Sequence, residues 1–149
     1  MLTTEDWTKV TGTPPVVKGL VWFTDGSKME GTGAGVYGQF AGRRLSFSLG
    51  RYATVFQTEI YAILECVHEI QSQNRPETYM SICSDSQAEL KALEAVRTSP
   101  LVRQCQKALN DISALHTVGL FWVPGHTGVR GNEIADELAR DGYSQVCGT

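Results

Sequence analysis

The sequence predicts an α/β domain built on a five-stranded mixed sheet, with three antiparallel strands and then two parallel strands, flanked by helices. Three short segments of strand character come first in the chain, and glycine-containing turns separate them. Beyond residue 54 the pattern changes, because stretches with helical apolar spacing alternate with two further β-branched segments. A strand that runs parallel to an earlier one needs a long crossover connection, and these helices supply it.

The antiparallel strands are expected over residues 19–25, 31–38 and 43–49, with a turn at 39–42. The first is a bulky apolar run that ends at Asp25, which is typical of a central strand. The second strand is rich in glycine. We expect these glycines to serve a tight turn and close strand packing, because the phosphate-binding motif G-x-x-x-x-G-K-[ST] is missing.

The second half of the chain is expected to alternate helices with the two parallel strands. An amphipathic helix is predicted over residues 54–73, where apolar residues recur at positions 56, 60, 63, 64, 67 and 70, and Pro76 follows its end. A strand over 78–84 then leads into Asp85, and helices are expected over 86–97 and 100–115. A last strand over 118–123, a glycine-rich loop over 124–131 and a helix over 132–142 complete the order.

Length and composition suit one globular domain. The chain has 149 residues, and we expect residues 1–18 to form a lead-in or linker, 19–145 the domain and 146–149 a C-terminal tail. The lead-in leaves open that the chain is an excised piece of a longer polypeptide. The net charge of −3 gives no global footprint for nucleic acid and requires a local patch or metal ions for such a role.

The cysteine spacing and the lengths of the apolar segments indicate the cellular compartment of the protein. The four cysteines form no C-x-x-C pair, so they are interpreted as reduced structural thiols of an intracellular protein, and nuclear and cytoplasmic residence both stay open. No secretory signal and no apolar run long enough to span a membrane is seen in the sequence.

Four carboxylates are predicted to meet at one edge of the sheet. Asp25 and Asp85 end two strands that are expected to be neighbours, while Glu59 and Asp136 lie on helices that can lean over the same edge. Bunched carboxylates repel one another unless a cation lies between them, and hard divalent cations prefer oxygen ligands. Two Mg²⁺ or Mn²⁺ ions in such a site can activate water and stabilise the leaving oxygen of a phosphodiester.

Each acid also has an ordinary structural explanation. Asp25 before Gly-Ser suits a turn, and Glu59 suits the first turns of a helix, where the dipole favours acids. Asp85 suits a helix cap, and Asp136 suits a solvated helix face. Only the joint placement of the four points to a metal site.

The motifs that carry these acids resemble the type I ribonuclease H family. The matching segments are TDGS at 24–27, Thr58-Glu59, SDSQ at 84–87 and WVPGHTGVRGNEIADELA at 122–139, in the family's order and spacing over residues 19–142. The residues of VFQTEIYAILE and of the last segment are most similar to those of ribonuclease H domains of non-LTR retrotransposon polyproteins. The resemblance implies the RNase H-like fold and hydrolysis of the RNA strand of an RNA–DNA hybrid, leaving 5′-phosphate and 3′-hydroxyl ends.

The resemblance also implies roles for individual residues. Asp25, Glu59, Asp85 and Asp136 carry over as ligands of two Mg²⁺ ions, for which Mn²⁺ can substitute. His126 matches the family histidine associated with proton transfer or product release, a role that suits a side chain titrating near neutral pH.

Substrate contacts follow from the same resemblance. Gly26 and Ser27 are expected to offer backbone N–H groups to the RNA strand, and Gln87 matches a residue that lies in the minor groove. Asn132 matches a family residue near the active site, and a role in capping the last helix is equally open. Recognition of RNA requires reading the 2′-hydroxyl, from which Glu59 can accept a hydrogen bond.

The sequence departs from many family members at two places. Val55, Phe56 and Gln57 stand where asparagines often precede the helix glutamate, and the short stretch over 97–101 leaves no room for a basic protrusion. A covalently linked reverse transcriptase domain is therefore a possible partner, and the isolated domain is expected to be a monomer. A catalytically weak or inactive hybrid-binding domain is the alternative, while an exonuclease is disfavoured because Asp25-Gly26-Ser27 lacks the D-x-E pattern.

Overall fold

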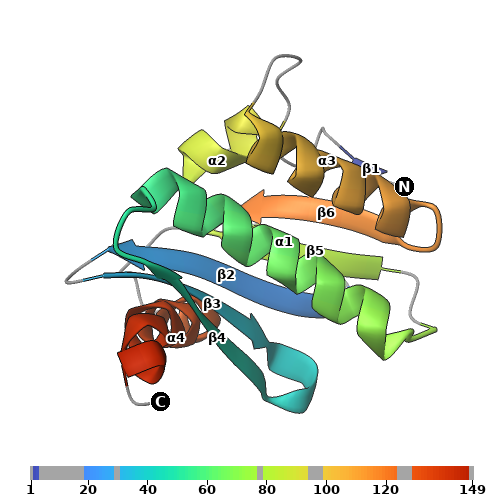
Figure 1. Ribbon diagram of the computed structural model, residues 1–149. Coiled ribbons are helices and arrows are strands. Elements are labelled where there is room, and N and C mark those ends of the chain that lie inside the picture. The colour runs from blue at the N-terminus through green and yellow to red at the C-terminus, as the bar shows by residue number, and fades with distance from the viewer. Residues whose placement is uncertain are drawn as a thin grey trace.

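The computed structural model describes residues 2–3, 19–28, 31–76, 79–93, 99–123 and 129–147. Along these residues helices and strands alternate in the predicted order (Figure 1). The elements are β1 (Leu2–Thr3), β2 (Leu20–Lys28), β3 (Thr32–Gly38), the 3₁₀ helix η2 (Gln39–Ala41), β4 (Arg43–Gly50), α1 (Val55–Gln73), β5 (Tyr79–Ser84), α2 (Gln87–Ala92), α3 (Pro100–Ser113), β6 (Thr117–Trp122) and α4 (Arg130–Cys147).

The sheet confirms the predicted mixed topology. Its strand order is β1-β6-β5-β2-β3-β4. The pairs β2–β3 and β3–β4 are antiparallel, while β5 runs parallel to both β2 and β6. The sequence did not predict β1, in which Leu2 lies opposite Val118 and extends the sheet beyond β6.

Several element limits differ from the prediction. The strand β2 continues three residues beyond Asp25, to Lys28, because its antiparallel pairing with β3 extends to Thr32. The last helix begins two residues earlier and ends five residues later than expected. The domain limits at 18 and 145 stay a prediction, since residues 4–18 and 148–149 lie outside the described residues, although α4 continues into the expected tail.

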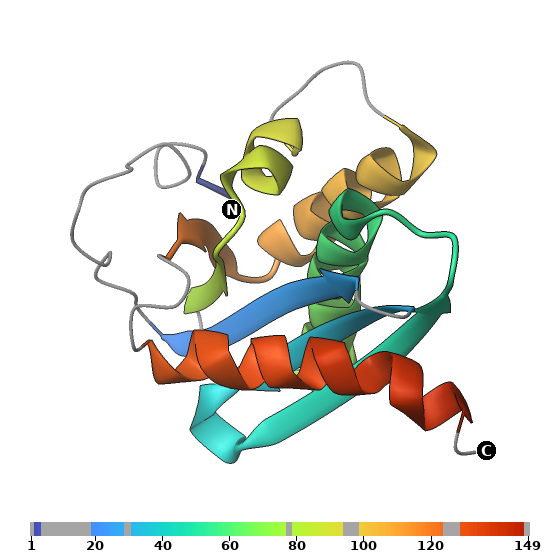
Figure 2. The same cartoon turned by 90° about the vertical axis from the view of Figure 1, so that its left-hand side faces the viewer.

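Helices cover both faces of the sheet. Figures 1 and 2 show α1, α2 and α3 on one face and α4 lying across the other. The helix α4 approaches β3 closely because Gly35 has no side chain: a Cβ there would lie 2.6 Å from Ala139 N and 2.8 Å from Leu138 Cβ. This confirms that glycines of the second strand serve close packing, and the packing partner is a helix.

The main hydrophobic core lies between the sheet and the helices α1 and α3, which cover one of its faces. Its fully buried side chains include Trp22, Ile60, Ile63, Ile82, Leu109 and Leu120. A smaller cluster of Phe23, Cys83, Val123 and Ala135 packs between the sheet and α4. Burial of this apolar surface contributes roughly 25 cal/mol per Å² to folding, so the two clusters hold the helices on the sheet.

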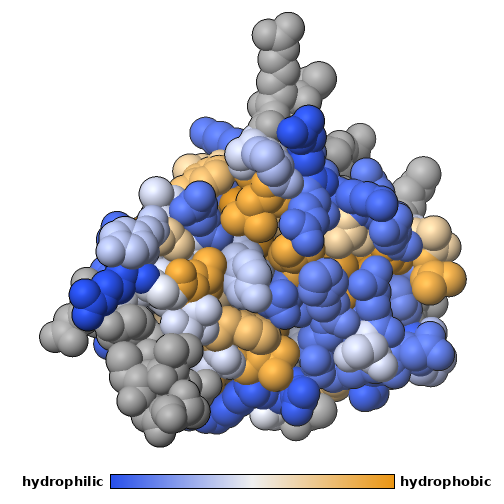
Figure 3. Space-filling view, viewed as in Figure 1, coloured by the Kyte–Doolittle hydropathy of each residue, from blue (hydrophilic) through white to orange (hydrophobic). Residues whose placement is uncertain are grey.

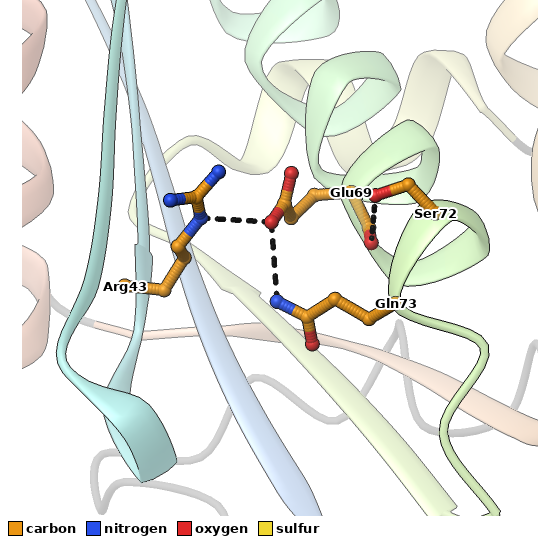
Figure 4. Close-up of polar contacts among 4 residues, drawn as sticks. All are labelled: Arg43, Glu69, Ser72 and Gln73. Carbon is orange, nitrogen blue, oxygen red and sulfur yellow. Dashed lines mark hydrogen bonds and ion pairs between the residues drawn. The ribbon is translucent and has the colours of Figure 1, made fainter.

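Side-chain hydrogen bonds cap the start of α1 and link its C-terminal half to β4. The Thr54 side chain accepts a hydrogen bond from Gln57 N at 3.0 Å, and Gln57 Oε1 accepts one from Thr54 N at 2.8 Å, which completes a capping box. Near the other end, Arg43 Nε of β4 donates to Glu69 Oε1 at 2.8 Å, and Gln73 Nε2 donates to the same oxygen at 3.1 Å (Figure 4). The helix is therefore fixed to the sheet at its C-terminal half.

The described cysteines lie in the protein interior, and the surface carries mostly polar residues. Cys66, Cys83 and Cys105 are buried free thiols, and burial raises the pKa of Cys83 and Cys105 to about 12. The surface over α1 and α3 is largely hydrophilic, with small separate apolar patches (Figure 3). None of the helices in the described ranges is long and apolar enough to cross a bilayer.

Candidate active site

Asp25 lies inside β2, where it is buried and faces away from bulk water. It pairs with Gly35 of β3 and is 4% exposed. Its Oδ1 accepts a hydrogen bond from Gly26 N at 2.9 Å, so this N–H group, which was expected to contact RNA, is engaged by the carboxylate. The prediction that the acid stands at the tip of the strand was wrong, because the β2–β3 ladder extends past it.

Glu59 reaches the same place from the first turns of α1. The helix approaches β2 at Gly26, where a Cβ would overlap Thr58 Oγ1 and lie 2.6 Å from Glu59 N. Because no side chain stands there, the buried Glu59 can extend past the strand toward Asp25. The glycine of the TDGS segment therefore sets the distance between helix and strand.

Asp85 enters from the turn between β5 and α2. Trp122 Nε1 donates to its backbone oxygen at 3.2 Å, and Ser86 N donates to Ser84 Oγ at 3.2 Å, which fixes the turn. Asn132 Nδ2 of α4 donates to Asp85 Oδ2 at 3.5 Å. Since β5 is the parallel neighbour of β2, the turn brings Asp85 beside Asp25, as the sequence predicted.

The three acids form one group. Asp25, Glu59 and Asp85 each offer a carboxylate oxygen, and these oxygens all lie within 4.8 Å of one another. Three elements that are distant in sequence thus present oxygen donors to a single point, and two of the three side chains are buried.

Burial and mutual repulsion make these carboxyl groups weak acids. Burial, the charge of Asp85 and the charge of Asp136 raise the pKa of Asp25 to about 7. Burial, the charge of Asp25 and a hydrogen bond to it raise the pKa of Glu59 to about 11. Without a cation, both carboxyl groups therefore keep their protons to a higher pH than ordinary acids do.

Asp136 lies near this group without joining it. It is half-buried on α4, and its Oδ2 forms an ion pair with Arg140 Nη2 at 3.1 Å. Its negative charge still contributes to the raised pKa of Asp25, so its electrostatic influence reaches the three acids. The structure thus brings three of the four predicted acids together and leaves the fourth at the periphery.

The other predicted residues are placed less completely. His126 lies outside the described residues, and only the backbone of Gln87, at the start of α2, is described. Ser27 follows Gly26 in β2 and is half-buried. Asn132 is the third residue of α4, so it does not cap the helix. It is 3% exposed, and its Oδ1 has no hydrogen-bond partner in the described ranges.

One acidic residue near the site was not predicted. Glu89 of α2 is 4% exposed, and its charge contributes to the raised pKa of Glu59. An acid in the first turn of a helix is common, because the helix dipole favours it. Its spacing from Asp85 follows no known motif in the sequence, so only its burial distinguishes it.

The donor set fits a hard divalent cation. All three grouped side chains supply carboxylate oxygens, and within the part of the chain that the structure describes the buried Glu59 Oε2 has no hydrogen-bond partner. Buried carboxylates without donors are costly unless a cation neutralises them. Magnesium and manganese prefer such oxygen ligands, so the residues present fit these ions.

The mixed sheet with buried acids at its carboxyl edge defines an RNase H-like domain with a carboxylate site. The solved RNase H1 of the halophilic archaeon Halobacterium salinarum shares this fold, with a TM-score of 0.64 at 20% identity over 85% of this chain and 98% of that one. The family model described as RNase H matches residues 17–144. The chain belongs to the RNase H family, and the prediction of a ribonuclease H enzyme is confirmed.

Proteins with a similar sequence include a viral polyprotein and bacterial ribonucleases H. The Pol polyprotein of Ovine maedi visna related virus is 31% identical over 147 residues, which cover 91% of this chain and only 12% of the polyprotein. The ribonuclease H of Nitrosomonas eutropha is 29% identical over 148 residues, covering 83% of this chain and 89% of the bacterial protein. The finer assignment to non-LTR retrotransposons stays a prediction.

Proposed function

We propose that this domain hydrolyses the RNA strand of RNA–DNA hybrids endonucleolytically, with two Mg²⁺ ions as cofactors. The observation that carries the proposal is the convergence of carboxylate oxygens from Asp25, Glu59 and Asp85 within 4.8 Å. Membership of the RNase H family supports the reaction class, and the spacing of the acids suits cations rather than a structural network. The expected products carry 5′-phosphate and 3′-hydroxyl ends.

The acids of the chain hold the cations and orient the substrate. Asp25 of β2 and Asp85, which follows the neighbouring strand β5, lie beside Glu59 of α1. Asp136 of α4 is proposed to add a further ligand. When bound, the two cations supply the positive charge that activates water and stabilises the leaving oxygen. Asn132 holds the Asp85 carboxylate by its Nδ2 donor, and His126 is proposed to move a proton or assist product release.

Recognition of the hybrid is proposed to differ from that of members with asparagines before the helix glutamate. At the start of α1, Val55 is 46% exposed, while Phe56 packs partly against the core. Neither side chain can donate a hydrogen bond to a base edge. Ser27, Gln87 and the 2′-hydroxyl contact of Glu59 are therefore the proposed substrate contacts, with Asn132 close to the cleavage site.

The domain is further proposed to act beside a reverse transcriptase. The similarity to a segment of a viral Pol polyprotein supports a covalently linked polymerase partner, and the short stretch over 97–101 leaves the grip on the hybrid to other parts of a longer chain. An origin in a non-LTR retrotransposon and an intracellular location belong to the same proposal. The isolated domain is proposed to be a monomer.

A cleavage assay on an end-labelled RNA–DNA hybrid tests this function. The unmodified chain should cut only the RNA strand, only with Mg²⁺ or Mn²⁺ present, and a chelator should stop it. Asp25→Asn should abolish cleavage, because the amide removes a negative charge from the cation site while keeping its shape. Asp111→Asn, an exposed substitution of the same kind on α3, is the matched control and should cleave normally.

Two outcomes would contradict the proposal. Retained Mg²⁺-dependent cleavage by Asp25→Asn would show that the grouped acids are not the reaction site. Binding of the hybrid by the unmodified chain without any cleavage would favour the alternative of an inactive hybrid-binding domain.

A further inference from the structure

Glu89 lies in the first turn of α2, four residues after Asp85. The helix packs against the N-terminal half of α1, beside the turns that carry Glu59 (Figure 1). Glu89 is only 4% exposed. An acidic side chain on a helix of six residues would ordinarily face solvent. A first-turn acid that only complements the helix dipole gains nothing from burial, because water already solvates it well.

The buried carboxylate of Glu89 lacks a hydrogen-bond donor at one oxygen. Its Oε2 is inaccessible to solvent and has no hydrogen-bond partner among the described residues, and the same is true of Glu59 Oε2. Buried carboxylate oxygens without donors are rare in folded proteins, and an ion or water that satisfies them is the usual reason. Both oxygens therefore point to a ligand that the protein binds here.

Glu89 lies close to the cation site, because it follows Asp85 by four residues and its helix α2 packs against α1, which carries Glu59. Its negative charge raises the pKa of Glu59, and the charge of Asp85 raises the pKa of Glu89 after the larger effect of burial. Glu89 is nevertheless not part of the group whose oxygens lie within 4.8 Å of one another. Its charge interacts with those of the three grouped acids, but its carboxylate is too distant to share one cation with all of them.

We propose that Glu89 is an outer residue of the cation site, whose carboxylate accepts hydrogen bonds from the hydration shell of a divalent cation held by Asp25, Glu59 and Asp85. This inference rests on the proposed function. It assigns to this chain a further acid that strengthens cation binding in the absence of substrate.

The chemistry of magnesium suits such a residue. Mg²⁺ loses its water reluctantly and keeps several water ligands in protein sites. An outer carboxylate accepts hydrogen bonds from these waters and adds negative charge at a distance where it does not displace them. Substitution of outer residues typically weakens metal binding about 10–100-fold.

Calorimetric titration of the full chain with Mg²⁺ and with Mn²⁺, without hybrid, tests the inference. Glu89→Gln keeps the shape and removes the charge, so it should weaken binding of both ions about 10-fold. Glu89→Asp keeps the carboxylate and should retain most of the affinity. Asp111→Asn removes one exposed negative charge far from the site and should bind as the unmodified chain does.

Every outcome decides the inference. Equal Mg²⁺ affinity of Glu89→Gln and the unmodified chain overturns it while leaving the proposed function intact. If the unmodified chain binds neither Mg²⁺ nor Mn²⁺, the proposed function falls as well. Because Glu89 repels Asp85 and Glu59, Glu89→Gln should fold at least as stably; an unfolded variant would show that the fold itself needs the carboxylate, which also overturns the inference.

Discussion

At the scale of single residues, Gly26 controls how closely α1 approaches the buried acids. The family resemblance predicted that it contacts the RNA strand, with a turn after Asp25 as the ordinary structural alternative. The structure places it inside β2, in contact with Thr58 and Glu59 of α1. This role depends on the distance between a strand and a helix 30 residues later, which no local pattern in the sequence records.

Gly26→Ala is expected to separate the acids. The new Cβ would overlap Thr58 Oγ1, so the first turn of α1 must shift and carry Glu59 away from Asp25. Overpacking of this kind costs about 1–3 kcal/mol, which urea unfolding measures, and Mg²⁺ affinity by calorimetry should fall with it. The double variant Gly26→Ala/Thr58→Ala removes the overlapping oxygen and should recover part of both losses. Unchanged stability and affinity in Gly26→Ala would show that α1 does not need this approach.

His126→Ala addresses a residue outside the described ranges that the family resemblance singles out. If His126 moves a proton, its loss should slow turnover about 10²-fold, within the range usual for such groups. Single-turnover cleavage of the hybrid across pH measures this, and the Mg²⁺ affinity of the variant should stay unchanged. A rate equal to that of the unmodified chain would make the histidine a bystander.

At the scale of elements, the apolar spacing over 54–73 predicted α1 well, because its buried face packs on the sheet with a regular period. The end of β2 was mispredicted, since the polar residues Ser27 and Lys28 continue the strand only through pairing with β3. Glu89 was missed for a related reason. A glutamate in a first helical turn is ordinary in sequence, and only packing of α2 against α1 buries it.

Thr54→Ala should loosen the N-terminal turn that presents Glu59. Loss of the capping box removes the acceptor of Gln57 N and costs about 0.5–2 kcal/mol of stability. Because the first turn then frays, Mg²⁺ affinity should fall while the core stays intact. Thermal unfolding and calorimetry measure the two effects, and Thr54→Ser, which keeps the acceptor oxygen, is the control. Loss of stability in Thr54→Ser as well would point to packing of the threonine methyl group instead.

At the scale of the whole molecule, the site depends on topology more than on any one segment. Parallel pairing of β2 with β5 brings Asp25 and Asp85 together, and α1 and α4 approach from opposite faces (Figure 2). Apart from β1, the order of strands and helices along the chain could be predicted from periodicity, and the three grouped acids from motif spacing. The peripheral position of Asp136 could not, because its ion pair with Arg140 depends on side-chain geometry at the surface of α4.

The grouped acids also make the stability of the whole domain depend on pH and on cations. Ordinary aspartate and glutamate titrate near 3.8 and 4.5, whereas in the fold the pKa of Asp25 is raised to about 7 and that of Glu59 to about 11. A group whose pKa is raised on folding stabilises the protein fully below its unfolded value, and this contribution is lost as the pH rises through the folded value. The metal-free domain should therefore lose stability as the pH rises from about 4 through about 7, where Asp25 titrates, and further towards about pH 11, where Glu59 titrates.

Divalent cations should reverse this loss, because they bind the deprotonated acids and release protons. A ligand that binds only the folded state stabilises it by RT ln(1 + [L]/Kd), so the rise in Tm caused by Mg²⁺ should be larger at about pH 8 than at about pH 6. Thermal unfolding with and without Mg²⁺ at both pH values measures the effect. Asp25→Asn removes one titrating group, and should flatten the pH dependence, raise the Tm of the metal-free domain and weaken the response to Mg²⁺. A pH-independent Tm in the unmodified chain, or an equal response to Mg²⁺ in Asp25→Asn, would mean that these carboxyl groups neither repel one another nor bind a common cation.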